Sequence, residues 1–250
     1  MSNSRFIHGF HAVVARLRYK PESVREIFID AARKDSRIRD LLKQAEESGC
    51  RVVIIEAGRL DGMTGETARH QGVVARVDAD RRPVFLDDVL DTLKDPPFLL
   101  VLDGIQDPHN LGACLRVADC VGAHAVIAPK DRAVGLTQVA IKVASGAADV
   151  VPYITVTNLA RALREMKERG IWVIGADGQA KENLYAAQWP DAVAWVLGAE
   201  GGGLRRLTRE TCDRCVAIPM SGSVQSLNVS VAAGVCMFEA RRRRLAFFSH

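Results

Sequence analysis

The stretch Phe98-Leu-Leu-Val-Leu102 is a run of five apolar residues with no polar residue among them. A second such run, Ala192-Val-Ala-Trp-Val-Leu197, follows later in the chain. Strands that are apolar throughout are typical of a parallel sheet whose two faces are both covered by helices. Because such sheets bind ligands beyond the carboxyl ends of their strands, the loops after Leu102, Leu197 and Pro219 are the first candidates for a site.

The apolar patterns around these two runs predict a larger α/β domain over residues 98–250. A smaller α/β segment over 1–75 precedes it, with helical patterning at 9–17 and 38–47. Between the two segments, residues 76–97 are rich in aspartate and proline, and we predict a linker there. In the larger domain we predict strands over 98–102, 123–128, 152–156, 171–176, 193–198 and 216–219, and helices over 110–121, 136–144, 159–169, 204–211 and 227–241.

Length and composition exclude several classes of protein. A chain of 250 residues is one large domain or two unequal ones. The mixed composition, 48% hydrophobic, excludes a disordered, collagen-like or coiled-coil chain. The chain contains neither a secretory signal at its start nor an apolar run of the ~18 residues that a membrane span needs, so we expect a cytoplasmic protein. The net charge of +4 does not by itself identify a nucleic acid as the partner.

The six cysteines are scattered among apolar residues, which in a cytoplasmic chain favours reduced and buried thiols. Cys212 and Cys215 have the spacing of a zinc or redox pair, but no second pair or histidine lies near them in the sequence. We therefore predict no metal site.

The first twenty residues contain several basic side chains and no acidic one. The cations are Arg5, Arg16, Arg18 and Lys20. Such a cluster can contact RNA phosphates, although a solvated basic face is the commoner explanation from the residues alone.

Three segments combine polar residues with the predicted strand ends. In Asp107–Asp119, Asn110 can cap a helix, and Arg116 follows within two turns as a candidate anchor for phosphate or ribose. In Val196–Leu204, glycines surround Glu200, but the GxGxxG spacing of a nicotinamide site is missing.

The third segment runs from Ile218 to Gly234 and contains a Ser/Gly loop before a helix. Ser226 is predicted as the N-cap of that helix. Asn228 falls in its first turn, from which a side chain can reach a ligand.

Together and in this order, the segments resemble the motifs of the SpoU branch of the SPOUT RNA 2′-O-methyltransferases over residues 98–242. The matching motifs are Asn110-x-Gly112…Arg116, Leu197-Gly-Ala-Glu-Gly-x-Gly203 and Ile218-Pro-Met…Ser226-Leu-Asn-Val-Ser230. Residues 1–75, with His8-Gly-Phe-His-Ala-Val13 and His70-Gln-Gly72, are similar to the ribosomal-protein-L30e-like RNA-binding module that many of these enzymes carry.

This resemblance implies a parallel sheet with a deep trefoil knot, a homodimer, and S-adenosylmethionine as cofactor. It implies methylation of a ribose 2′-hydroxyl, and over the whole chain it points to a guanosine of 23S ribosomal RNA as the substrate. By motif match, the implied cofactor-binding residues are Gly198, Ala199, Ile218, Met220 and Leu227. The implied catalytic residues are Arg116, Asn110, Glu200, Ser226 and Asn228.

Family members use the residue matching Arg116 to activate the hydroxyl. A guanidinium has a pKa above about 12 and is a poor proton acceptor. We therefore interpret Arg116 as a group that stabilises the developing alkoxide and a neighbouring phosphate.

Three alternatives remain at this point. The same motifs fit a tRNA ribose 2′-O-methyltransferase, and the same fold could carry a catalytically silent RNA-binding or ribosome-assembly factor. A nicotinamide-dependent oxidoreductase is disfavoured by the missing fingerprint.

Overall fold

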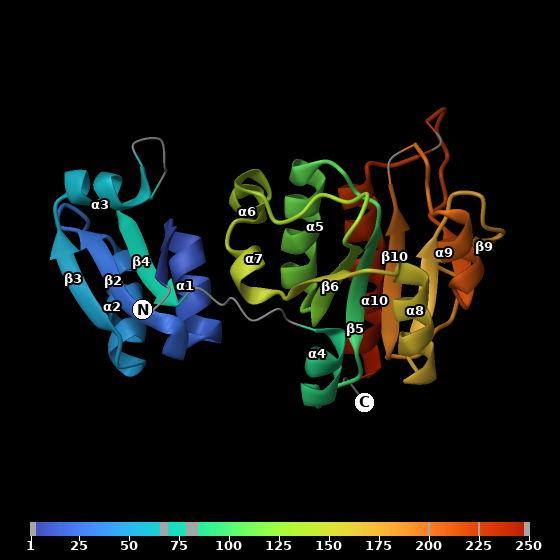
Figure 1. Cartoon of the computed structure of the whole chain (residues 1–250), viewed down its shortest axis with the longest axis horizontal. Helices are drawn as coiled ribbons and strands as arrows, with labels where there is room; N and C mark the ends of the chain where they lie inside the picture. The colour runs from blue at the N-terminus through green and yellow to red at the C-terminus, as the bar shows by residue number, and fades with distance from the viewer. Residues whose placement is uncertain (1–3, 66–69, 79–84, 200, 225, 248–250) are drawn as a thin grey trace. The chain divides into compact units, whose positions relative to one another are not determined.

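The computed structural model describes residues 4–65, 70–78, 85–199, 201–224 and 226–247. The chain divides into two compact units, which Figure 1 draws in one ribbon. Unit 1 consists of Met1–Arg82 together with Ser145–Val150. Unit 2 consists of Pro83–Ala144 and Val151–His250.

Unit 1 contains a four-stranded mixed sheet in the order β1-β4-β2-β3. Strand β4 pairs antiparallel with β1 and β2, whereas β2 and β3 are parallel. Its strands are β1 (Ser4–His8), β2 (Val24–Asp30), β3 (Arg51–Ile55) and β4 (Val73–Asp78). Its α-helices are α1 (Phe10–Tyr19), α2 (Ser36–Glu47), α3 (Ala57–Thr64) and the short α7 (Ala147–Val150).

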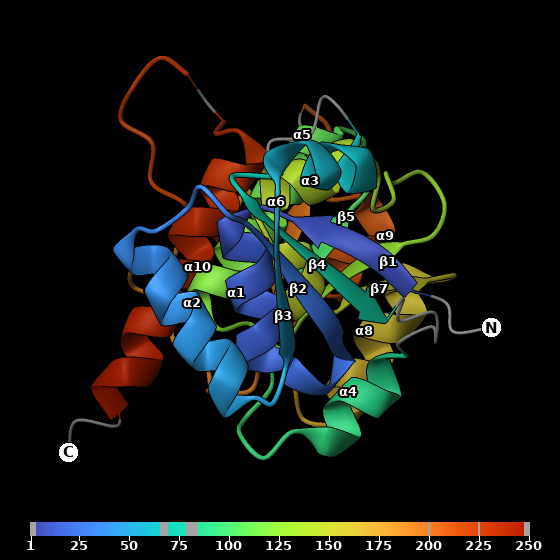
Figure 2. The same ribbon diagram turned by 90° about the vertical axis from the view of Figure 1, so that its left-hand side faces the viewer.

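Helices cover both faces of this sheet, because successive residues of a strand point to opposite faces. Ile27 and Ile29 of β2 join a core that includes residues of α1 and α2. Phe28, between them, packs on the other side with Leu60 of α3. In Figure 2, the ribbons of α1 and α2 run beside the strands of this unit.

Unit 2 contains a seven-stranded sheet in the order β7-β6-β5-β10-β8-β11-β9. Every strand pair recorded for this sheet is parallel, which confirms the predicted α/β class. Its strands are β5 (Phe98–Asp103), β6 (Ala125–Pro129), β7 (Tyr153–Val156), β8 (Trp172–Ala176), β9 (Glu182–Asn183), β10 (Val193–Gly198) and β11 (Arg214–Ala217).

Both faces of the larger sheet are also buried. Leu99 and Val101 of β5 pack in one core with Leu163 of α8, while Leu100 and Leu102 are fully buried on the opposite face. Helices α5 and α10 pack against each other, and they contact β6 and β10 respectively. The helices of this unit are α4 (Leu86–Thr92), α5 (Pro108–Val121), α6 (Gln138–Ala144), α8 (Leu159–Glu168), α9 (Arg206–Thr211) and α10 (Val229–Phe247).

The range 76–97, predicted as a linker, is partly structured. It contains the end of β4 and all of α4, whose Leu86 packs in the core of unit 2. The division between the units falls at Arg82 and Pro83. The trefoil knot and the homodimer stay predictions. No helix in the described ranges is both long and apolar enough to cross a membrane.

Candidate functional site

A cleft of about 210 Å³ lies at the carboxyl ends of β8, β10 and β11. Parallel strands bring these ends to one edge of the sheet, so the segments that follow them meet there. The N-terminal part of α10 completes the wall. All five residues predicted to bind the cofactor line this cleft together with Ser226, namely Gly198, Ala199, Ile218, Met220 and Leu227.

A tight turn after β10 forms one wall of the cleft. The backbone N–H of Gly203 donates to the carbonyl of Ala199 at 2.9 Å. A Cβ atom on Gly198 would lie only 2.0 Å from the carbonyl carbon of Gly203. The turn can therefore close this tightly only with glycine at position 198. Glu200, predicted as catalytic, lies outside the described residues.

The described lining of the cleft is mostly apolar, with one charged side chain. Leu197, Ile218 and Leu227 supply aliphatic surface. Asp177, directly after β8, supplies the charge, and its Oδ2 lies 2.9 Å from Nε of Arg209. The sequence interpretation missed Asp177, although its position after the apolar strand 171–176 was a usable signal.

A hydrogen bond joins the first motif to the third. Nδ2 of Asn228 donates to Oδ1 of Asn110 at 3.0 Å. Asn110 is buried, with 8% of its surface exposed, so its amide depends on protein partners. The structure thus brings two of the predicted catalytic residues into contact from positions 118 residues apart.

The two predicted N-caps are wrong. Asp107 caps α5, because its Oδ1 accepts from the N–H of His109 at 2.9 Å, and Asn110 lies inside the helix. At α10, Oδ1 of Asn228 accepts from the N–H of Ser230 at 2.9 Å, and the helix begins at Val229. Ser226 stays before the helix, exposed at the cleft.

Gly112 of the first motif serves helix packing. A Cβ atom on this residue would lie 2.6 Å from the carbonyl oxygen of Ala140 and 2.7 Å from Cβ of Val143. Only glycine permits this approach of α5 to α6.

Arg116 is exposed on α5 and is not among the residues that line the cleft. Within the described residues it has neither a hydrogen bond nor an ion pair. It follows Asn110 by six positions in the helix, which turns the two side chains about 120° apart around the helix axis. Within one chain, the structure therefore does not bring Arg116 to Asn110.

Asp103 at the end of β5 holds the segment after β10 in place. This carboxylate is 1% exposed. It accepts hydrogen bonds from the backbone N–H of Arg205 at 2.9 Å and from Nε of the same residue at 2.6 Å. The sequence interpretation missed this residue too. An acidic residue directly after an apolar strand is expected to be partly buried and to need a partner, and that was a usable signal.

The four basic residues predicted to bind RNA differ in their surroundings. Arg16 is 2% exposed, and its Nε donates to Oγ of Ser23 at 2.6 Å. A buried guanidinium cannot meet an RNA phosphate, so the prediction for Arg16 is wrong. Arg5 forms an ion pair with Asp149 within unit 1. Arg18 is exposed and Lys20 is half-buried.

Cys212 and Cys215 are free thiols whose sulfur atoms both lie close to Gly175. A hydrogen bond from Cys212 lowers the pKa of Cys215 to about 7 and raises the pKa of Cys212 itself. No cluster of histidine, cysteine or acidic residues in the described ranges could hold a metal ion.

Two family comparisons cover nearly the whole chain. Residues 97–238 match the SpoU rRNA Methylase family. Residues 6–83 match a family described as RNA 2′-O ribose methyltransferase substrate binding.

Curated relatives match over the full length. The chain is 60% identical to 23S rRNA (guanosine-2′-O-)-methyltransferase RlmB of Ralstonia nicotianae, with 98% of each chain covered. It is 57% identical to the protein of the same name from Bordetella pertussis, over 98% of this chain and 99% of the relative.

Among solved structures, the SpoU methyltransferase AviRb from Streptomyces viridochromogenes in complex with AdoMet shares the fold. Its TM-score is 0.73 at 22% identity, with 98% of this chain and 92% of that chain covered.

Proposed function

Because the chain belongs to the SpoU rRNA methylase family, we propose that it transfers a methyl group from S-adenosylmethionine to the ribose 2′-hydroxyl of a guanosine in 23S ribosomal RNA. The observation that carries this proposal is the cleft beyond β8, β10 and β11. It gathers residues of the second and third motifs around one cavity. The names of relatives more than 50% identical supply the substrate.

The residues of the cleft fit the cofactor. The glycines Gly198, Gly201 and Gly203 of the turn after β10 leave backbone groups open to the cavity. The aliphatic side chains of Leu197, Ile218 and Leu227 offer a surface for an adenine ring. The carboxylate of Asp177, which is ion-paired with Arg209, offers acceptor oxygens at the cleft. When bound, the cofactor supplies an electrophilic methyl group on a sulfonium.

The reaction also requires an acceptor oxygen that is positioned and can lose its proton. A neutral ribose hydroxyl is a poor nucleophile, so positioning and electrostatic stabilisation must supply much of the acceleration. We assign the positioning of the RNA to Ser226 at the cleft and to the hydrogen-bonded pair Asn110 and Asn228, with Glu200 as a further member of this group.

We assign the stabilising charge to Arg116. A guanidinium is a poor proton acceptor, so we assign this residue as an anchor for the developing alkoxide and an adjacent phosphate. Because Arg116 lies outside the cleft of its own chain, the proposal includes a homodimer in which Arg116 of one copy serves the cleft of the other.

Unit 1 would supply affinity for the RNA. We propose that Arg5, Arg18 and Lys20 contact phosphates, and that the enzyme works on ribosomal RNA in the cytoplasm. The match of residues 6–83 to a substrate-binding family supports this role.

The proposal is tested with purified protein and radiolabelled S-adenosylmethionine. We expect label in a 23S ribosomal RNA transcript and none in total tRNA. Label in tRNA alone would instead favour the tRNA methyltransferase. Absence of cofactor binding by calorimetry would favour the silent RNA-binding factor.

A further inference from the structure

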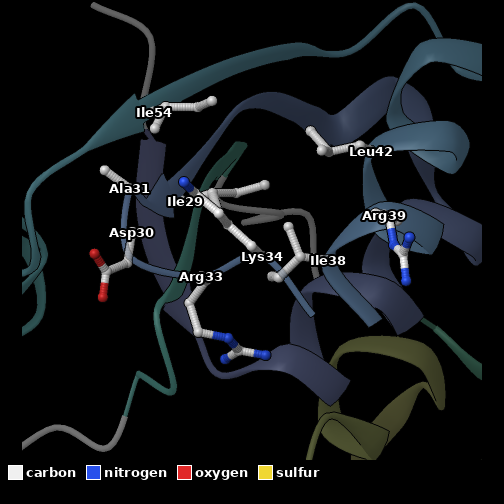
Figure 3. A pocket seen from close by; sticks show the side chains of 9 residues that line it. All are labelled: Ile29, Asp30, Ala31, Arg33, Lys34, Ile38, Arg39, Leu42 and Ile54. Carbon is white, nitrogen blue, oxygen red and sulfur yellow. The ribbon is translucent and has the colours of Figure 1, made fainter. Parts of the chain in front are cut away.

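A second cavity, of about 300 Å³, lies in unit 1 beside the carboxyl ends of β2 and β3 and the first turns of α2. Figure 3 shows the side chains that line it. They come from the ends of the two parallel strands, the connection after β2 and helix α2, and are Ile29, Asp30, Ala31, Arg33, Lys34, Ile38, Arg39, Leu42 and Ile54.

The inner surface of this cavity is aliphatic. Ile29 and Ile38 belong to the core of unit 1, and Leu42 packs against that core. Ile54 is different, because 63% of its surface is exposed. It lies on β3, an edge strand of the sheet. An exposed isoleucine beside an open aliphatic cavity provides a flat apolar surface for a ligand.

Two cations at the cavity are available to a ligand. Lys34 and Arg39 are exposed, and neither has a hydrogen bond or ion pair within the described residues. Arg33 is committed elsewhere, since its Nε lies 2.6 Å from Oδ2 of Asp35 and its Nη1 donates to the carbonyl of Gln71. With Asp30 as the only acid among the lining residues, the cavity carries a positive charge.

We propose that this cavity binds an unpaired nucleotide of the substrate RNA. The base would lie against Ile54 and the aliphatic wall, while Lys34 and Arg39 would contact the flanking phosphates. Single-stranded RNA combines an exposed ring face with a phosphate on each side. Proteins stack an unpaired base against aromatic or apolar side chains and bind its phosphates with cations. This inference rests on the proposed function, because it assumes that the ligand of unit 1 is RNA.

Charge is tested with two matched double variants of the full-length chain. Lys34→Ala/Arg39→Ala removes the two cations of the cavity. Lys43→Ala/Arg59→Ala removes two exposed cations of α2 and α3 that do not line it. Binding of a fluorescein-labelled RNA hairpin with an unpaired loop is measured by anisotropy at several salt concentrations.

Each lost phosphate contact to single-stranded RNA makes the negative slope of log K against log salt shallower by about 0.7. We therefore expect the slope of the cavity variant to be shallower than that of the wild type by about 1.4. Between 50 and 200 mM salt, wild-type affinity should then fall about sevenfold more than that of the variant. The control variant should keep the wild-type slope. Equal slopes for all three proteins, or an equal loss in both variants, would overturn the proposal.

The apolar part is tested with Ile54→Ser, using Leu207→Ser on α9 as the control for an exposed apolar residue. We expect Ile54→Ser to weaken hairpin binding about fivefold or more and to leave binding of a blunt duplex of equal length unchanged. Equal weakening for hairpin and duplex would contradict the base contact. Displacement of the hairpin by an acidic peptide at lower concentration than by unlabelled hairpin would show that the cavity takes a protein ligand. Methylation by the wild-type protein, measured separately, distinguishes these failures from failure of the proposed function.

Discussion

Replacing Gly198 by alanine should damage the cofactor cleft and leave the fold intact. The new Cβ atom would lie 2.0 Å from the carbonyl carbon of Gly203, 2.1 Å from its oxygen and 2.3 Å from the backbone nitrogen of Leu204. All three are backbone atoms, so no side-chain rotation can relieve the overlap. The turn would have to move by about 1.4 Å to reach the ordinary contact distance of 3.4 Å.

Overpacking of this kind costs about 1–3 kcal/mol. If the turn moves, the wall of the cleft moves with it. The same free energy then appears as a loss of cofactor affinity of about 5- to 150-fold. If the turn stays in place, the same cost lowers the free energy of unfolding instead.

Calorimetric titration with S-adenosylmethionine and urea unfolding should therefore be performed on the same variant. Gly202→Ala is the matched control, because a Cβ atom there has no atom within 4 Å and the residue is in the same turn. The reasoning is refuted if Gly198→Ala matches both the wild type and Gly202→Ala in cofactor affinity and in stability.

Three further perturbations test other contacts. A double-mutant cycle with Asn110→Ala and Asn228→Ala should give a coupling of about 0.5–1.5 kcal/mol in the free energy of unfolding, because one hydrogen bond joins the two amides. Additive effects of the two substitutions would exclude that bond. Arg116→Ala should abolish methylation, while its affinity for S-adenosylmethionine, measured by calorimetry, stays within about twofold of wild type. Near-normal turnover of Arg116→Lys with an unshifted pH profile would contradict the assigned role. Two arginines of α10 lower the pKa of Glu239 from 4.5 to about 2. The ionised Glu239 therefore stabilises the folded state above its ordinary pKa, and this stabilisation is lost as the pH falls toward 2. In urea unfolding, the free energy of unfolding of Glu239→Gln should fall less between pH 5 and pH 2 than that of the wild type.

The central strands could be predicted from the sequence because their burial leaves a direct pattern. Strands β5 and β10 are buried on both faces, and both are continuous apolar runs. The two-residue β9 and the four-residue α7 are too short for a period to be recognised. Helix α4 was hidden by the aspartates that also suggested a linker.

The errors at single residues have identifiable causes. Val13, Arg16 and Leu17 lie at helical spacing on one face, so the burial of Arg16 could have been predicted from its apolar neighbours. The basic composition of the first twenty residues led instead to the prediction that Arg16 binds RNA. Several residues suited to N-caps stand close together before α5 and α10, and propensity alone does not choose among them.

Contacts between distant parts of the chain are beyond pattern reasoning. The bond between Asn110 and Asn228 and the placement of Ile54 beside Lys34 depend on tertiary packing. The cofactor residues were named in advance only because their motifs resemble those of a known family.

The central claim is best tested on RNA from a strain that lacks this gene. Total RNA from that strain is incubated with the purified protein and labelled S-adenosylmethionine, and the modified nucleotide is mapped. The account predicts label in 23S ribosomal RNA, on the 2′-oxygen of a guanosine. Label on a base, label confined to tRNA, or no transfer at all would contradict it.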